Sequence, residues 1–127
     1  MVVGMRAAAH KPVLVVEDNT DTREVIKVLL SLEGYAVVTA ADGAEAMAKL
    51  RGGLDPCLII LDLMMPVKDG YQFRREQMAD PTLQRIPVIV CSGDGNVAYK
   101  AESLQATAYY HKPIEPDELI AMVARHC

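Results

Sequence analysis

The chain has 127 residues, about half of them apolar, and a formal charge of −4. This length suits one compact domain with a core of its own. The acidic balance excludes a broad positive surface that could hold a nucleic-acid backbone. No segment is apolar for long enough to span a bilayer. We therefore expect neither direct nucleic-acid binding nor membrane insertion, and we expect the cytoplasm as the compartment.

The N-terminus and the cysteines point to no special chemistry. Residues 1–11 lack the continuous apolar stretch of a signal peptide and are expected to form a disordered tail before one domain at 12–127. The three cysteines, Cys57, Cys91 and Cys127, show no C-x-x-C spacing. Cys57 and Cys91 lie in apolar runs, where a free thiol acts as a small hydrophobic group. We expect neither a disulfide nor a zinc site.

Five short apolar runs recur along the chain, with amphipathic segments between them. The runs are Val13–Val16, Ala36–Thr39, Leu58–Leu61, Val88–Cys91 and Ala108–Tyr110. Four of them are rich in Val, Ile or Leu with little polar alternation, which is typical of strands buried on both faces. The fifth run is weaker and is assigned as a strand from its place in the series.

The segments between the runs have helical patterns. In the first, Val25, Leu29 and Leu32 share one face, and Gly34 stands where a left-handed C-terminal cap is expected. Helix-start signals precede three others: Asp42 with Glu45, Asp69 with Gln72, and Pro116. The remaining segment, Asn96–Leu104, is short and mixed. Alternating strands and helices predict parallel pairing through right-handed crossovers, and hence a sheet covered on both faces.

Polar residues follow most of the predicted strands, and in open parallel sheets ligands bind beyond these strand ends. The residues are Glu17, Asp18, Asp62, Ser92 and Lys112. Three crowded carboxylates repel one another unless a cation lies among them, and Mg²⁺ prefers such oxygen ligands. A carboxylate can accept a phosphoryl group covalently, while lysine and serine can bind phosphoryl oxygens. The set therefore indicates Mg²⁺-dependent phosphoryl transfer.

The segment LDLMMPVKDG at Leu61–Gly70 closely resembles the phosphoacceptor segment of receiver domains from two-component response regulators. Val13–Asp18, Cys91–Gly93 and the Lys112–Pro113 pair match that family in order and spacing. The resemblance covers 12–127. It implies an α/β, flavodoxin-like, doubly wound parallel sheet of five strands in the order 2-1-3-4-5, with five helices. It also implies a signalling switch that catalyses only its own phosphorylation and dephosphorylation.

The resemblance implies which residues bind the metal and which residue accepts the phosphoryl group. Asp62 matches the phosphoacceptor. Glu17, Asp18, Asp62 and the backbone carbonyl of Met64 match the ligands of Mg²⁺, with Glu17 often acting through water. The phosphoryl donor would be a histidine kinase or a histidine phosphotransfer domain, and the downstream protein is unknown. Lys112 matches the lysine of the motif.

The resemblance also implies a conformational switch. Ser92 sits at the hydroxyl position, and Tyr109 falls on the aromatic position whose ring moves inward when the hydroxyl turns toward the phosphoryl group. The Lys112–Pro113 peptide bond is expected to be cis, because proline lowers the preference for trans to about 0.5–1 kcal/mol and the chain must turn at once toward a helix near Pro116.

Three features depart from the family pattern or have no role assigned by it. Gln105 stands where the family often has glycine, so the helix end before the fifth strand must adopt a left-handed or altered turn, at about 1 kcal/mol. Asp94, like Met64, occupies a variable position that is thought to tune the phosphoryl lifetime. His111 matches no family role and is expected to lie on the surface.

Three other functions fit the sequence less well. A haloacid-dehalogenase-type phosphatase would need a second Asp two residues after Asp62, where this chain has Met64. A flavodoxin-like FMN carrier would need a glycine- and hydroxyl-rich phosphate loop, but Asn19–Thr22 follows two acids. A degenerate receiver that only docks is disfavoured because the acceptor, the acids and the lysine are all present. Whether the chain acts alone or forms part of a larger regulator or hybrid kinase stays open.

Overall fold

A computed structural model describes residues 11–127 of the chain. Its five strands are β1 (Val13–Val16), β2 (Val37–Ala40), β3 (Leu58–Asp62), β4 (Val88–Ser92) and β5 (Ala108–His111). Its five helices are α2 (Thr20–Leu32), α3 (Gly43–Arg51), α4 (Gly70–Ala79), α5 (Val97–Ser103) and α6 (Pro116–His126). All strand pairs are parallel, in the order β2-β1-β3-β4-β5. The predicted fold class, strand order and helix number are confirmed.

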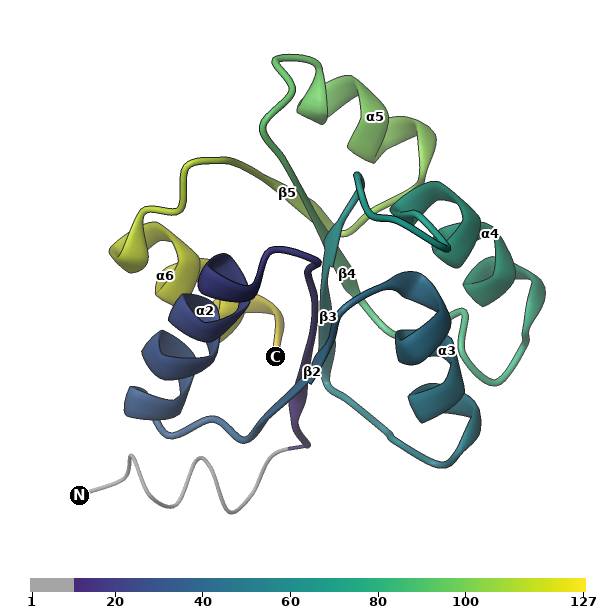
Figure 1. The fold of residues 1–127 in the computed structure, drawn as a ribbon, viewed down its shortest axis with the longest axis horizontal. Coiled ribbons are helices and arrows are strands. Elements are labelled where there is room, and N and C mark those ends of the chain that lie inside the picture. Colours follow the sequence, from purple (N-terminus) through teal and green to yellow (C-terminus); the bar gives the residue numbers. More distant parts are fainter. Residues whose placement is uncertain (1–10) are drawn as a thin grey trace.

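The helices cover the sheet on both faces (Figure 1). Helices α2 and α6 pack on one face, and α3, α4 and α5 pack on the other. The central strands β1, β3 and β4 are buried along their whole length, which accounts for their continuous runs of apolar residues. Within residues 11–127, no helix is both long enough and apolar enough to cross a membrane.

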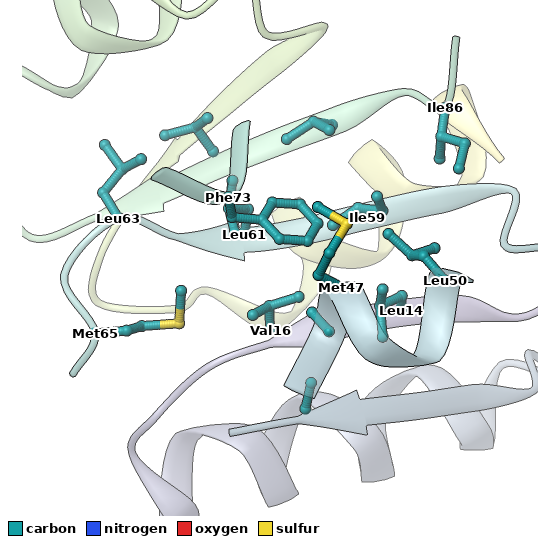
Figure 2. Packing of buried hydrophobic residues seen from close by; sticks show 14 of the residues in the cluster. Leu14, Val16, Met47, Leu50, Ile59, Leu61, Leu63, Met65, Phe73 and Ile86 are labelled. Carbon is teal, nitrogen blue, oxygen red and sulfur yellow. The ribbon is translucent and has the colours of Figure 1, made fainter. Parts of the chain in front are cut away.

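The larger core cluster lies between the sheet and helices α3 to α5 (Figure 2). Phe73 of α4 is fully buried beside Leu61 and Ile59 of β3, and Met47 of α3 packs against the same layer. Full burial of an aliphatic or aromatic side chain contributes about 1.5–3 kcal/mol. The site-bearing strand β3 is therefore held rigidly at the centre of the domain.

Several local predictions are confirmed at the helix ends. Asp69 and Gln72 form a complete capping box at the start of α4, and the Asp42 side chain accepts a hydrogen bond from the Glu45 amide at the start of α3. Gly34 has a positive φ of 94° after α2. Gln105 has a φ of 56°, so the helix end before β5 does adopt the left-handed turn expected there.

A smaller core cluster lies between the sheet and helices α2 and α6. The face that Val25, Leu29 and Leu32 share on α2 is not its most buried one, because of the three only Leu29 packs against this cluster. Val25 and Leu32 are exposed, whereas Ile26 and Leu30 are buried against the sheet. The helix carries two overlapping apolar stripes, and helical spacing alone does not say which one the sheet selects. The second stripe remains on the surface.

The expectation that no disulfide forms is wrong. Cys57 and Cys127 are bonded to each other, with Cα atoms 5.2 Å apart. Cys57 does not lie in the strand but directly precedes β3, and Cys127 follows α6. The fold brings together two cysteines that are 70 residues apart, and no local spacing signals such a pair. The expected tail falls on residues 1–10, outside the described residues, except for Lys11, whose ammonium lies 2.9 Å from Asp55.

Candidate functional site

The parallel sheet brings the polar residues at its strand ends to one edge. Glu17 and Asp18 follow β1, Asp62 ends β3, Ser92 ends β4, and Lys112 follows β5. Neighbouring strands are parallel and pair in similar register, so their C-terminal ends lie side by side. The sequence pattern and the topology therefore place these five side chains around one point.

Three carboxylates form the centre of this site. Glu17, Asp18 and Asp62 each offer a ligand oxygen, and these oxygens lie within 4.8 Å of one another. Glu17 and Asp62 are only 2% and 5% exposed, while Asp18 is open to solvent. Mg²⁺ takes oxygen ligands and usually keeps several waters, so these carboxylates could hold the ion without supplying every ligand. The donor set and its spacing fit a hard divalent cation.

Lys112 supplies the positive charge that balances this cluster in the metal-free protein. Its Nζ donates a hydrogen bond to Glu17 Oε1 at 2.8 Å and lies 3.6 Å from Asp62 Oδ1. Burial alone would lower the pKa of Lys112, but the hydrogen bond to Glu17 and the charges of both acids outweigh it and raise that pKa. The ammonium therefore stays charged and points at the acids.

Asp62 is the carboxyl group that its surroundings perturb most. Burial, followed by the negative charge of Glu17, raises the pKa of Asp62 to about 7, although the Lys112 charge and the Met64 amide act in the opposite direction. The Met64 N–H donates to Asp62 Oδ1 at 3.3 Å. A buried carboxyl with a raised pKa at the C-terminal end of a strand in a parallel sheet is typical of a functional site.

Ser92 and Tyr109 lie on adjacent strands but face different surroundings. Ser92 is buried, and its hydroxyl accepts a hydrogen bond from the Asp94 amide at 3.1 Å. Tyr109 is 46% exposed, so its ring lies outward in this state. Its neighbour Tyr110 is buried, and the Tyr110 hydroxyl donates to the Glu115 carbonyl before α6.

The loop after β5 begins with a direct link to β4. The Lys112 amide donates to the Ser92 carbonyl at 2.9 Å, so the two residues are coupled through the backbone. The Lys112–Pro113 peptide bond is cis, the isomer expected from the sequence. His111 is exposed, as expected.

Arg23 of α2 is a residue that sequence reasoning missed. Its Nη1 donates to the Glu17 carbonyl at 2.8 Å and lies 3.4 Å from the Asp18 carbonyl. The guanidinium thus fixes the backbone of the acidic pair from the first turns of the helix. A basic residue a few positions after an acidic pair is too common on helices to have signalled this contact.

The raised pKa of Asp62 predicts how Mg²⁺ binding depends on pH. The unfolded pKa of an aspartate is about 3.9, so the folded metal-free protein holds an extra proton between about pH 4 and 7 and loses stability as the pH rises through that window. Mg²⁺ must displace this proton. We expect Mg²⁺ to bind about tenfold more weakly at pH 6 than at pH 8, as measured by amide NMR titration.

The control for this pH dependence is Asp62→Asn, which removes the titrating group. In that variant any residual Mg²⁺ affinity should change little between pH 6 and pH 8. An equal pH dependence in both proteins would assign the proton to another group.

Comparison with known proteins assigns the family. The sequence model of the response regulator receiver domain matches residues 13–124, and the chain belongs to this family. It is 40% identical over 116 residues to the probable transcriptional regulator ycf27 of Cyanophora paradoxa, a match covering 89% of this chain and 46% of the relative. The chain thus spans about half the length of the first curated relatives it matches.

Solved structures agree with this assignment. The chemotaxis response regulator CheY4 of Vibrio cholerae superposes with a TM-score of 0.85 at 29% identity, covering 94% of this chain and all of that chain. The response regulator TrrA of Thermotoga maritima, solved in complex with Mg²⁺ and BeF, superposes with a TM-score of 0.81 at 31% identity, covering 92% of this chain and 99% of that chain. The chain is therefore a receiver domain of two-component signalling.

Proposed function

We propose that Asp62 accepts a phosphoryl group from a phosphohistidine of a histidine kinase or a histidine phosphotransfer domain. The observation that carries this proposal is the buried Asp62 carboxyl beside Glu17, Asp18 and Lys112 at one edge of the sheet. An Asp62 carboxylate oxygen attacks phosphorus, the bond from phosphorus to the donor imidazole nitrogen breaks, and an aspartyl-phosphate results. The protein acts on no separate substrate.

Mg²⁺ is the proposed cofactor, held by Glu17, Asp18, Asp62 and the Met64 carbonyl. When bound, it neutralises negative charge on the carboxylates and on the transferred group. The complex of TrrA with Mg²⁺ and the phosphoryl mimic BeF supports this assignment. Removal of Mg²⁺ leaves two buried acids with Lys112 alone, so transfer without the metal is expected to be slow.

Lys112 and Ser92 bind the phosphoryl group after transfer. The Lys112 ammonium already lies 3.6 Å from Asp62 and can move from Glu17 to a phosphoryl oxygen. The Ser92 hydroxyl can break the hydrogen bond that it accepts from the Asp94 amide and donate to another phosphoryl oxygen. Both residues therefore have a partner in the unphosphorylated state that the new group replaces.

The Ser92 movement is the proposed origin of the switch. In this structure the Tyr109 ring lies outward. When Ser92 turns toward the phosphoryl group, the space it leaves permits Tyr109 to turn inward, which reshapes the surface of α5 and β5. The extra phosphoryl–hydroxyl bond shifts the population between two packings of the same chain.

The phosphodonor is proposed to dock on the exposed stripe of α2 and the adjoining loop after β5. A groove next to the site is lined by residues of both segments, among them Val25, Lys112, Pro113 and Ile114. The donor histidine must approach Asp62 from this edge, and exposed apolar side chains beside the opening suit a protein partner. The proposed compartment is the cytoplasm, as expected for the family, and the downstream partner is a protein of unknown identity.

The test uses beryllofluoride with Mg²⁺ as a stable phosphoryl mimic. Amide NMR signals around Asp62 and around Tyr109 should shift together in the wild type and should not shift in Asp62→Asn. In Ser92→Ala the signals near Asp62 should still shift, while those near Tyr109 should respond much less. Equal responses near Tyr109 in Ser92→Ala and wild type would contradict the coupling, and a full response in Asp62→Asn would contradict the site.

A further inference from the structure

The disulfide joins two elements whose other ends lie at or near the phosphorylation site. Cys57 directly precedes β3, which ends in Asp62, and Cys127 follows α6, which begins shortly after Lys112. The cysteine Cα atoms are 5.2 Å apart, within the usual disulfide range. We propose that Cys57 and Cys127 form a reversible redox pair, exchanging with low-molecular-weight thiols and disulfides, that fixes or releases the end of α6.

The position of the two sulfurs favours exchange. Cys57 and Cys127 are only partly buried at the margin of the smaller core cluster, so a small thiol can reach them. Accessible disulfides are the ones that exchange readily and serve regulation. In a reducing compartment the pair is expected to rest as two thiols and to oxidise when the thiol pool does.

Cys91 provides a contrast within the same chain. It is fully enclosed in β4, and burial raises the pKa of its thiol to about 12. A thiol that stays protonated and buried does not attack a disulfide. Thiol–disulfide exchange in the described part of the chain is therefore confined to Cys57 and Cys127.

Helix α6 is the element that depends on the link. Of its 11 residues only Leu119 and Val123 are buried. Its start is well fixed, because Pro116 presets the first turn and the Tyr110 hydroxyl bonds the chain at Glu115. At its end, Cys127 contributes a backbone hydrogen bond to Val123 within the same helix and the disulfide to the sheet. Without that bond, the buried Leu119 and Val123 and the partly buried Met122 hold a short helix that would be marginal alone.

Oxidation of the cysteine pair proceeds by two thiol–disulfide exchange steps. A thiolate of the pair attacks a low-molecular-weight disulfide such as glutathione disulfide, forming a mixed disulfide and releasing one glutathione thiolate. The second cysteine thiolate then attacks the protein sulfur of the mixed disulfide and releases the second glutathione. The protein pair loses two electrons, glutathione disulfide gains them, and the reverse sequence restores the two thiols.

The link lies at the opposite end of β3 from Asp62, so its opening changes α6 without removing any site residue. The inference does not rest on the proposed phosphorylation. Oxidised protein should hold α6 firmly, while reduced protein should let its C-terminal turns open. Helix α6 packs beside α2 (Figure 1), and α2 is the proposed docking site of the phosphodonor. The redox state would therefore change the mobility of a helix that adjoins this docking surface.

The test compares wild-type protein equilibrated with glutathione disulfide and with reduced glutathione. Peptide mapping after alkylation should show a Cys57–Cys127 cross-link in the first sample and two alkylated cysteines in the second, with Cys91 labelled only after unfolding. The melting temperature should be higher in the oxidised sample by roughly 10 °C. Amide exchange should be slowed in residues of α6 more than in β3.

Two variants separate the link from general effects. Cys91→Ala should keep the full difference between oxidised and reduced samples. Cys127→Ser, which can still fold like the reduced wild type, should form no cross-link and should show no slowing of amide exchange in α6, although Cys57 can still form a mixed disulfide with glutathione. The proposal is overturned if no cross-link forms in glutathione disulfide, or if α6 exchanges at the same rate in both redox states.

Discussion

Lys112→Met should lower the free energy of unfolding of the metal-free protein by about 3 kcal/mol, because removing the partly buried ammonium leaves two buried acids without a compensating charge. The ammonium bonds to Glu17 at 2.8 Å and lies 3.6 Å from Asp62, and both acids are buried. Saturating Mg²⁺ should restore most of the loss, because the ion replaces the missing positive charge and binds only the folded state. Urea unfolding with and without Mg²⁺ measures both quantities.

The matched control is Lys100→Met, which removes an ammonium that pairs with Asp94 on the surface. Exposed pairs contribute little to stability, so this variant should unfold almost like the wild type and should gain no additional stability from Mg²⁺. If Lys112→Met behaves like Lys100→Met, or if Mg²⁺ fails to restore its stability, the charge balance described for the site is wrong.

Gly70→Ala should lower the free energy of unfolding by about 3 kcal/mol, at the upper end of overpacking effects, and should displace the loop that follows Asp62. A Cβ at Gly70 would lie 2.6 Å from the Asp62 carbonyl oxygen and 2.7 Å from the Leu63 Cα. Both are backbone atoms and cannot rotate away. Because the Gly70 amide also donates to the Leu63 carbonyl at 3.1 Å, α4 cannot retreat without losing a hydrogen bond.

Gly95→Ala serves as the comparison for this prediction, since nothing lies within 4 Å of a Cβ built there. This substitution should change the unfolding midpoint in urea very little. If Gly70→Ala is as stable as the wild type and the Asp62 amide signal does not shift, the backbone around Gly70 has room for a Cβ and the prediction is wrong.

The sheet and the composition of the site could be predicted because each depends on local signals. Continuous Val, Ile and Leu runs are typical of strands buried on both faces, and the parallel topology then brings strand-end residues together. The left-handed conformation of Gln105 could also be predicted, because the chain must turn at this helix end whether or not glycine is present. Only the strand limits shifted, as with β2, which begins at Val37 rather than Ala36.

What could not be predicted depends on contacts between distant segments. The choice between Ile26 and Val25 as the inner face of α2 is made by the sheet, since both belong to apolar stripes of the same helix. The Cys57–Cys127 pair depends on how α6 returns to the start of β3. The Arg23 contact with the backbone of Glu17 likewise appears only once α2 has packed.

Intact-mass measurement after incubation with acetyl phosphate and Mg²⁺ tests the proposed role of Asp62 as the phosphoacceptor. The wild type should gain one phosphoryl group, peptide mapping should place it on the segment that contains Asp62, and Asp62→Asn should gain none. The adduct should also be absent when Mg²⁺ is chelated. An adduct of unchanged amount in Asp62→Asn would place the phosphoacceptor at another residue.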